Sequence, residues 1–286
     1  MTIAITGASG ALGRATAELV LQAVDPSEVV LTTRHPDSLA EFAARGAGVR
    51  PVDFADPRTL ATAFTGVDRL LLISTDAVGA RLDQQRAAIA AAADSGVGHI
   101  AYTSVPEPVP ANPALVVPDH AGTEQALRNS GVRWTMLRNN LYAHMQIPVI
   151  EQAIEAGRLV TNTGAGATAY VSREDCAAAA AAALTQDGHA DKAYDITGPE
   201  ALTAEDLTAL ASELGGREVE LVHTEDAAYA AGLRAAGLPE EVAEVVTSFG
   251  AASRGGFLGN TSSAVSDLTG RTPAALADII REALRS

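Results

Sequence analysis

Short, unbroken apolar runs alternate with helix-length segments through the first half of this 286-residue chain. Runs such as VVLTT (29–33) and RLLLI (69–73) do not alternate strictly between polar and apolar residues. Such continuous runs are typical of strands covered on both faces, as in a parallel sheet. Strand–helix repetition with short connections therefore predicts a doubly wound parallel α/β sheet.

The expected elements of this first part follow from these runs. The strands are predicted over residues 2–6, 29–33, 49–52, 69–73, 99–103 and 133–137. The helices are predicted over residues 11–23, 36–44, 57–64, 82–95 and 118–130.

The alternation of strand-like and helix-like segments becomes less regular after residue 138. The segments predicted there are a helix over 139–156 interrupted at Pro148, a Gly/Thr loop over 157–169, a helix begun by Ser172, a strand near 193–197, a helix over 203–214, a strand over 218–222 and several final helices. We expect residues 139–286 to form a smaller α/β substrate-binding part over the carboxyl edge of the sheet. No Pro-, Gly- or Ser-rich linker separates it from residues 1–138. The two parts should therefore make one compact unit, with some exchange of chain between them.

Three glycines mark the first turn from strand to helix. The stretch ITGASGALGRA places Gly7, Gly10 and Gly13 where a strand ends and a helix begins. Gly7 permits a sharp turn, Gly10 a close approach of backbone to ligand, and Gly13 close helix packing. Free amides at the helix start would then hold a pyrophosphate, so a Rossmann-type dinucleotide site is predicted in residues 1–138. The turn residues expected to contact the dinucleotide are Thr6, Gly7, Ala8, Ser9, Gly10, Ala11 and Leu12.

Arg34 follows the second strand, where NAD-binding chains of this class carry a carboxylate. A guanidinium suits the 2′-phosphate of NADP, whereas an acid would repel it. The sequence thus favours NADP(H) over NAD(H), the alternative being a solvated surface arginine. Arg14, in the first helical turn, could add positive charge or point to solvent.

Further side chains are expected along the same edge of the sheet. Asp53 could accept a hydrogen bond from the adenine amino group and Phe54 could stack on the ring. The alternative is an Asp that begins a helix and a Phe in the core. Ile73, Ser74 and Thr75 end the fourth strand and should line the crevice beside the nicotinamide ribose.

Several longer motifs occur in one order and spacing: ITGASGALGRA, LLLIS, HIAYTS, DHAGTE and LRNNLY, followed by FGAASRGGF. The chain resembles the NmrA-like atypical short-chain dehydrogenase/reductases, particularly the second type of bacterial quinone oxidoreductase and the triarylmethane reductases. The resemblance implies an NADP site that includes the glycine turn, Arg34 and residues 73–75. It adds Arg138, Asn139, Asn140, Leu141, Tyr142 and Arg173. The chain departs from the pattern at Gln125, where relatives often carry Lys, and at Asn140, where they carry a smaller residue.

The acid–base pair of standard short-chain dehydrogenases is missing. Those enzymes carry a Tyr and a Lys on the helix after the fifth strand, and this chain carries His120 and Glu124 there. A carboxylate in place of the ammonium would raise a neighbour's pKa rather than lower it. His120 could be a weak general acid or a residue of the pocket wall. Ser104 could hydrogen-bond an acceptor carbonyl or be structural. No ligand set for a metal is evident.

The chemistry that remains is hydride transfer needing little help with protons. We predict an NADPH-dependent oxidoreductase acting on a quinone or a similar planar, electron-poor acceptor. The alternatives are a triarylmethane-dye reductase and a non-catalytic NADP(H)-binding redox sensor.

Composition narrows the expected partners and location. A net charge of −15 argues against a nucleic-acid partner, and no apolar run is long enough to span a membrane. The single cysteine, Cys176, allows no disulfide within the chain and favours a cytoplasmic location. Pairing into a homodimer through exposed helices is a reasonable expectation.

Overall fold

The computed structural model describes residues 1–77 and 79–285. Its main element is a seven-stranded sheet with strand order β3-β2-β1-β4-β5-β6-β8. The strands are β1 Ile3–Ile5, β2 Val29–Thr33, β3 Gly48–Pro51, β4 Arg69–Leu72, β5 His99–Ser104, β6 Arg133–Asn139 and β8 Lys192–Ile196. All neighbours pair in parallel, which confirms the predicted doubly wound sheet. The order reverses between β1 and β4, and ligands of such sheets bind at the carboxyl ends beside this point.

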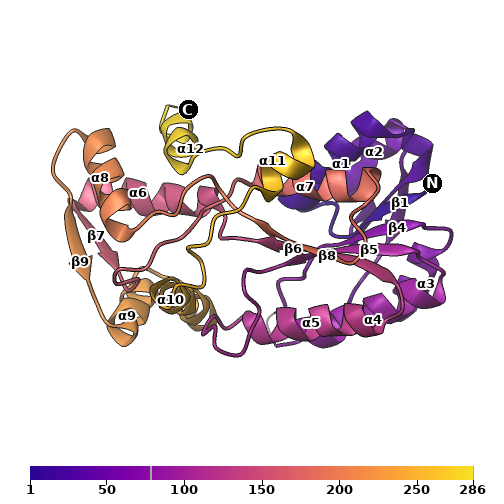
Figure 1. Cartoon of the computed structure of the whole chain (residues 1–286), viewed down its shortest axis with the longest axis horizontal. Helices are drawn as coiled ribbons and strands as arrows, with labels where there is room; N and C mark the ends of the chain where they lie inside the picture. Colours follow the sequence, from indigo (N-terminus) through magenta and orange to yellow (C-terminus); the bar gives the residue numbers. More distant parts are fainter. Residues whose placement is uncertain (78, 286) are drawn as a thin grey trace.

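Helices cover both faces of the sheet (Figure 1). One face carries α1 Ala11–Ala23, α2 Ala40–Ala44, α7 Arg173–Thr185 and α11 Ala264–Thr269. The other carries α3 Arg58–Phe64, α4 Arg81–Asp94 and α5 Val117–Asn129. Successive strand residues alternate between the two cores: Leu71 belongs to the first, and Leu70 and Leu72 to the second. Both faces are therefore dry, which explains the unbroken apolar runs.

Helix α7 is packed tightly because its middle is made of alanines. Ala177 to Ala183 are all buried, and the helix lies against α1. Small side chains let the two helices approach closely. Ser172 is the N-cap, as predicted, and its hydroxyl accepts a hydrogen bond from the Asp175 amide.

The rest of the chain forms a second body beyond the carboxyl edge of the sheet, at the left of Figure 1. Its elements are α6 Ile147–Ala156, β7 Arg158–Thr161, α8 Ala204–Gly215, β9 Glu220–His223, α9 Asp226–Ala235, α10 Glu240–Arg254 and α12 Leu276–Ala283. Short 3₁₀ turns occur at η1 Pro26–Glu28, η2 Pro36–Leu39 and η3 Ala143–Gln146. No described helix combines the length and the apolar character that crossing a membrane requires.

Three local predictions were wrong. The expected loop over residues 157–169 contains β7, which forms a two-stranded parallel sheet with β9. The helix expected over 139–156 begins only at Ile147, and Pro148 lies in its first turn, where proline is well tolerated. The helix expected over 36–44 divides into η2 and the short α2.

Candidate active site

The first turn has the geometry that a phosphate site needs. Gly7 has a φ of +59°, in the left-handed region. A Cβ on Gly13 would lie 2.4 Å from the Gly7 carbonyl oxygen, so only glycine lets α1 sit this close to the turn. Gly10 is the N-cap without a side-chain cap, and no acidic residue lies in the first turn of α1. The helix start therefore offers amides and a positive dipole end to an anion.

A cavity of about 380 Å³, here called the dinucleotide cavity, opens beside this turn at the carboxyl ends of β1, β2 and β4. The predicted residues that line it are Gly7, Ser9, Gly10, Arg34, Asp53, Phe54, Ile73, Ser74 and Thr75. Thr6 lies behind the turn: its hydroxyl donates to the Leu71 carbonyl at 3.1 Å and accepts from the Ile73 amide at 2.9 Å. It thereby holds the ends of β1 and β4 together. Ala8, Ala11 and Leu12 are outside the lining.

Two arginines near the turn differ in how they are paired. Arg34 is exposed, lines the cavity and makes no hydrogen bond or ion pair within the part of the chain that the structure describes. Arg14 donates to Glu41 and to the Ser38 carbonyl and lies outside the lining. Of these two arginines, Arg34 lines the cavity at the end of β2 and Arg14 does not.

Asp53 and Phe54 lie after β3, and Asp53 does not begin a helix, because α3 starts at Arg58 after the N-cap Pro57. The Asp53 carboxylate accepts from the Ala55 amide at 2.9 Å, which makes a local turn before α3. Phe54 packs on the apolar core below the sheet. Both residues also line the dinucleotide cavity.

A second cavity of about 200 Å³, the acceptor cavity, lies at the carboxyl ends of β5 and β6. The predicted residues in its lining are Ser74, Ser104, His120, Asn139, Asn140, Leu141 and Tyr142. Ser74 lines both cavities, so they meet at this residue. Ligands in the two cavities would therefore come closest to each other near Ser74.

The acceptor cavity continues toward the second body of the protein. A distal cavity of about 310 Å³, between η3, α6, β7 and α10, shares Leu141, Met145 and Phe249 with it. The Asn140 side chain donates to the Leu258 carbonyl at 2.9 Å and forms part of the acceptor cavity wall. The departure from the family pattern at this position therefore ties β6 to the segment after α10.

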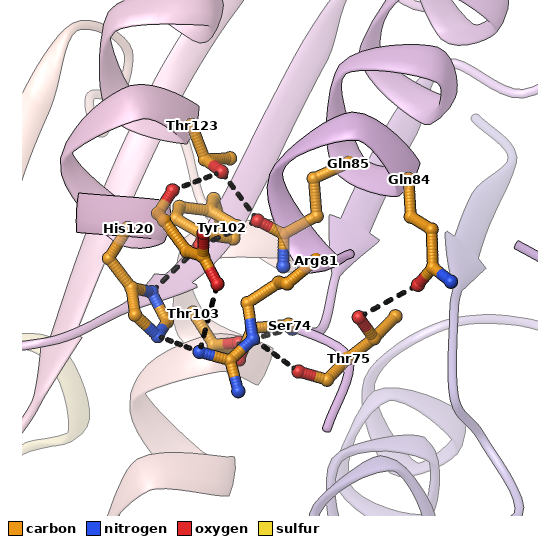
Figure 2. A network of polar contacts seen from close by, with 10 residues as sticks. Ser74, Thr75, Arg81, Gln84, Gln85, Tyr102, Thr103, His120 and Thr123 are labelled. Atoms are coloured by element: carbon orange, nitrogen blue, oxygen red, sulfur yellow. Dashed lines mark hydrogen bonds and ion pairs between the residues drawn. The ribbon is translucent and has the colours of Figure 1, made fainter. Parts of the chain in front are cut away.

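His120 belongs to a buried polar network at the wall of the acceptor cavity (Figure 2). The Tyr102 hydroxyl donates to Gln85 Oε1 at 3.0 Å, so His120 Nδ1, 2.7 Å from that hydroxyl, must be the protonated nitrogen. His120 Nε2 then accepts from Arg81 Nη1 at 3.4 Å. Burial, followed by the charge of Arg81, lowers the pKa of His120 to about 3. Neutral His120 therefore accepts a hydrogen bond from Arg81 through Nε2 and has no proton on that nitrogen to offer to the cavity.

Glu124 is buried like His120, and it joins α5 to the sheet. Its carboxylate accepts from Ser104 Oγ at 2.8 Å, from Arg138 Nε and Nη2 at 2.9 Å each, and from Arg128 Nη2 at 2.9 Å. Burial raises the pKa of Glu124, but the bonds and charge of Arg138, with Ser104 and Arg128, outweigh burial and hold it below its usual value. The Ser104 hydroxyl and the Arg138 guanidinium are thus directed to Glu124.

Arg173 lies outside both cavities. Its Nη2 atom is 2.6 Å from His144 Nε2, and the His144 ring stacks on Tyr142. Burial raises the pKa of Tyr142 to about 12, so its phenol stays protonated in the wall of the acceptor cavity. The resemblance placed Arg173 near the cofactor, and the structure joins it to that region only through this stack.

Sequence reasoning missed Arg81, Gln85 and Tyr102. Tyr102 is fully buried within β5, and a buried tyrosine hydroxyl usually has a hydrogen-bond partner. Arg81 and Gln85 lie on one face of α4, at a spacing of four residues. The segment GARLDQQ gave no sign that this face is buried against the cavity.

Comparisons with known proteins agree with this geometry. A family model described as NAD(P)H-binding matches residues 7–187. Quinone oxidoreductase 2 of Escherichia coli (strain K12) is 35% identical over 278 residues, 97% of each chain. NAD(P)H azoreductase of Xenophilus azovorans is 26% identical over 279 residues, which are 98% of this chain and 96% of that one.

Solved structures of reductases complexed with NADPH or NADP(H) are also similar to this chain. The E. coli NADPH-dependent quinone oxidoreductase QOR2, complexed with NADPH, has a TM-score of 0.95 at 35% identity, with 99% of this chain and 100% of that chain covered. Triphenylmethane reductase of Citrobacter sp., complexed with NADP(H), has a TM-score of 0.92 at 31% identity, with 99% and 100% covered. Both likenesses extend well past residue 187, through the second body.

Proposed function

The chain belongs to the NAD(P)H-binding family and is an NAD(P)H-dependent oxidoreductase, and we propose that it transfers a hydride from NADPH to a quinone or a similar planar, electron-poor acceptor. The observation that carries this proposal is the meeting of the dinucleotide and acceptor cavities at Ser74. Two ligands that meet there are held for direct transfer, which is the main task of a protein whose cofactor supplies the chemistry.

The residues present fit a dinucleotide with a 2′-phosphate. The Gly7 turn and the start of α1 suit the pyrophosphate, and Arg34 lines the cavity where the adenosine ribose would lie. Because Arg34 has no acidic partner among the described residues, its charge is available to the phosphate. We therefore propose a preference for NADPH over NADH. When bound, the dinucleotide supplies the hydride.

The lining of the acceptor cavity supports an acceptor that needs no proton from the protein. The titratable side chains among its described lining residues are Arg81, His120 and Tyr142. The pKa of His120 is lowered to about 3 and that of Tyr142 raised to about 12, so neither exchanges protons readily near neutrality. A quinone suits such a site because water can protonate the hydroquinone anion after hydride transfer.

Stopped-flow measurement of NADPH oxidation tests the proposal. The panel contains benzoquinones, naphthoquinones, cationic triarylmethane dyes and simple ketones, with NADH as the alternative donor. We expect the quinones to speed NADPH oxidation and the ketones to leave it unchanged, because ketone reduction needs a proton donor. Tight NADPH binding with no acceleration by any acceptor would instead support a redox-sensing protein.

A further inference from the structure

Arg81 brings a positive charge into the acceptor cavity. It is the first residue of α4, and its side chain is only 8% exposed. Among the described residues that line this cavity, it is the only Arg, Lys, Asp or Glu. The rest of the lining is largely apolar, with short hydroxyl and amide side chains.

The guanidinium is held firmly but is not neutralised at hydrogen-bond distance. Nε donates to the Thr75 carbonyl at 2.5 Å, and Nη1 donates to His120 Nε2 at 3.4 Å. The nearest carboxylate oxygen in the described chain is Asp119 Oδ2, 4.0 Å from Nη1. Nη2 makes no hydrogen bond to any described residue. Figure 2 shows the Thr75 and His120 contacts on the Nε and Nη1 side of the group, away from Nη2.

Burying the Arg81 guanidinium in this largely apolar lining costs free energy unless an anion compensates its charge. Removing an arginine from water is unfavourable unless a carboxylate or another anion compensates the charge. The contacts with Thr75 and His120 fix the orientation of the guanidinium, and the Asp119 carboxylate forms an ion pair with Nη1 only at 4.0 Å. Nη2 has no anionic partner among the described residues. The position of Arg81 is therefore suited to a ligand that carries, or acquires, negative charge.

We propose that Arg81 binds the oxyanion that forms on the acceptor, and that the protein's substrates are neutral carbonyl acceptors such as quinones rather than cationic dyes. This inference rests on the proposed function. A hydride, which is a proton with two electrons, passes from the dinucleotide to the neutral quinone. The dinucleotide is oxidised and the quinone becomes a hydroquinone monoanion. Arg81 Nη2 donates to the charged oxygen, which then takes a proton from water.

The network behind Arg81 then acts as a positioning device. Tyr102, fixed by Gln85, directs the proton of His120 to Nδ1, and this leaves Nε2 free to accept from Arg81. The Thr75 carbonyl accepts a hydrogen bond from Arg81 Nε, and the Thr75 hydroxyl donates to Gln84 Oε1 at 3.1 Å. Both Thr75 and Gln84 line the dinucleotide cavity, so the cation is fixed to the wall of the cofactor site.

A binding measurement tests the inference without any turnover. Protein saturated with NADP⁺ is titrated with 4-nitrophenol, whose phenolate form is yellow, across the pH range of its ionisation. We expect the phenolate to bind at least about tenfold more tightly than the phenol, because a charge-assisted bond favours the anion. Tighter binding of the phenol, as in an apolar pocket without a usable cation, overturns the inference on the wild-type protein alone.

Variants then assign the effect to Arg81. Arg81→Met should abolish the preference for phenolate, Arg81→Lys should keep part of it, and Arg86→Met, an exposed position on the same helix, should keep all of it. In turnover, Arg81→Met should lower kcat/KM for quinones by about a hundredfold or more, as loss of an oxyanion donor does, and should raise the weak activity expected with a cationic dye, because the repelling charge is removed.

Equal losses for quinone and dye, together with weaker NADP⁺ binding, would show that Arg81 only supports the Thr75 segment, and would overturn the inference. Preferential phenolate binding by a protein that oxidises NADPH with no acceptor would keep the anion site and reject the proposed reductase activity. The two failures are thus distinct.

Discussion

Arg138 on β6 and Glu124 on α5 form a two-pronged ion pair, with Nε and Nη2 of the arginine each 2.9 Å from a carboxylate oxygen. The Glu124 side chain is 1% exposed, so the pair is shielded from water on the carboxylate side. Glu124 lies on the helix on which standard short-chain dehydrogenases carry their proton-relay residues. In this protein the same helix therefore serves to fasten a strand of the sheet.

Replacing Glu124 should destabilise the fold more than it alters the chemistry. Glu124→Gln leaves the half-buried Arg138 without its anion, which should cost about 1–3 kcal/mol of the free energy of unfolding. Urea unfolding measures this loss, and Glu241→Gln at an exposed position of α10 should change the free energy by less than about 0.5 kcal/mol. An unchanged midpoint for Glu124→Gln would mean that the pair contributes nothing.

Removing the Arg34 side chain should weaken NADPH binding and spare NADH binding. A hydrogen bond to a charged group contributes about 1.5–3 kcal/mol, so Arg34→Ala should raise the Kd for NADPH about 10- to 100-fold. Fluorescence titration gives both constants. Arg45→Ala, an exposed arginine paired with Glu18, is the matched control and should change neither. A retained preference for NADPH in Arg34→Ala would assign the 2′-phosphate to another group.

Adding a methyl group at Gly13 should damage the dinucleotide turn. Its Cβ would lie 2.4 Å from the Gly7 oxygen and 2.7 Å from the Ala8 Cα, both backbone atoms that cannot turn aside. We expect Gly13→Ala to cost about 1–3 kcal/mol of stability and to weaken NADP⁺ binding in calorimetry. Gly232→Ala, inside α9, meets no atom within 4 Å and should gain about 0.5–1 kcal/mol. Equal effects of the two changes would contradict the close packing at Gly13.

The two buried histidines should make stability fall on mild acidification. Burial lowers the pKa of His99 to about 4 and that of His120 to about 3, against an ordinary value of 6.5. Below pH 6.5 the unfolded chain takes up protons that the folded chain refuses, so each histidine costs about 2 kcal/mol by about pH 5. Urea unfolding at this pH and near neutrality should show the fall.

Replacing either histidine separates this effect from the titration of carboxylates. His99→Asn and His120→Asn should each reduce the loss of stability by about 2 kcal/mol, whereas His35→Asn, at an exposed position, should leave it unchanged. The free energy of unfolding could instead depend on pH in the same way in all three variants and the wild type. The buried histidines would then take up protons at the same pH in the folded protein as in the unfolded chain.

The main sheet could be predicted because helices cover both faces of its strands, which are therefore continuous apolar runs, and because the strands end at recognisable turns. The family resemblance, now confirmed, rested on motifs whose spacing is local. Strands β7 and β9 were harder, because β7 lies in a Gly/Thr-rich segment and its partner follows 62 residues later. No local pattern reveals a pairing of that kind. The assigned strand, at residues 218–222, was close to β9 at Glu220–His223, while its partner went unnoticed.

The candidate site likewise contains residues that local sequence order predicts and residues whose role depends on tertiary contacts. Gly7, Arg34 and Ser74 were predicted because each follows a strand in a known order, and the structure brings them to one cavity. Arg81 could not be predicted, because its significance depends on burial and on how far it lies from the nearest carboxylate among the described residues, that of Asp119. His120 and Glu124 looked like a pair at helical spacing, but they point into separate networks. Which charged side chains pair with each other depends on the tertiary fold and not on their spacing along a helix.

The position of β8 in the sheet sets a limit on how the molecule can be divided. Strand β6 pairs on one side with β5 and on the other with β8, which the chain reaches only at Lys192. Helix α7, which covers α1, also comes from this later segment. A fragment ending at residue 139 would expose the unpaired edge of β6 and the apolar side of α1 to solvent, and such edges recruit other chains. We therefore expect that fragment to aggregate during synthesis, and the nucleotide-binding half to become soluble only after the chain has passed residue 196.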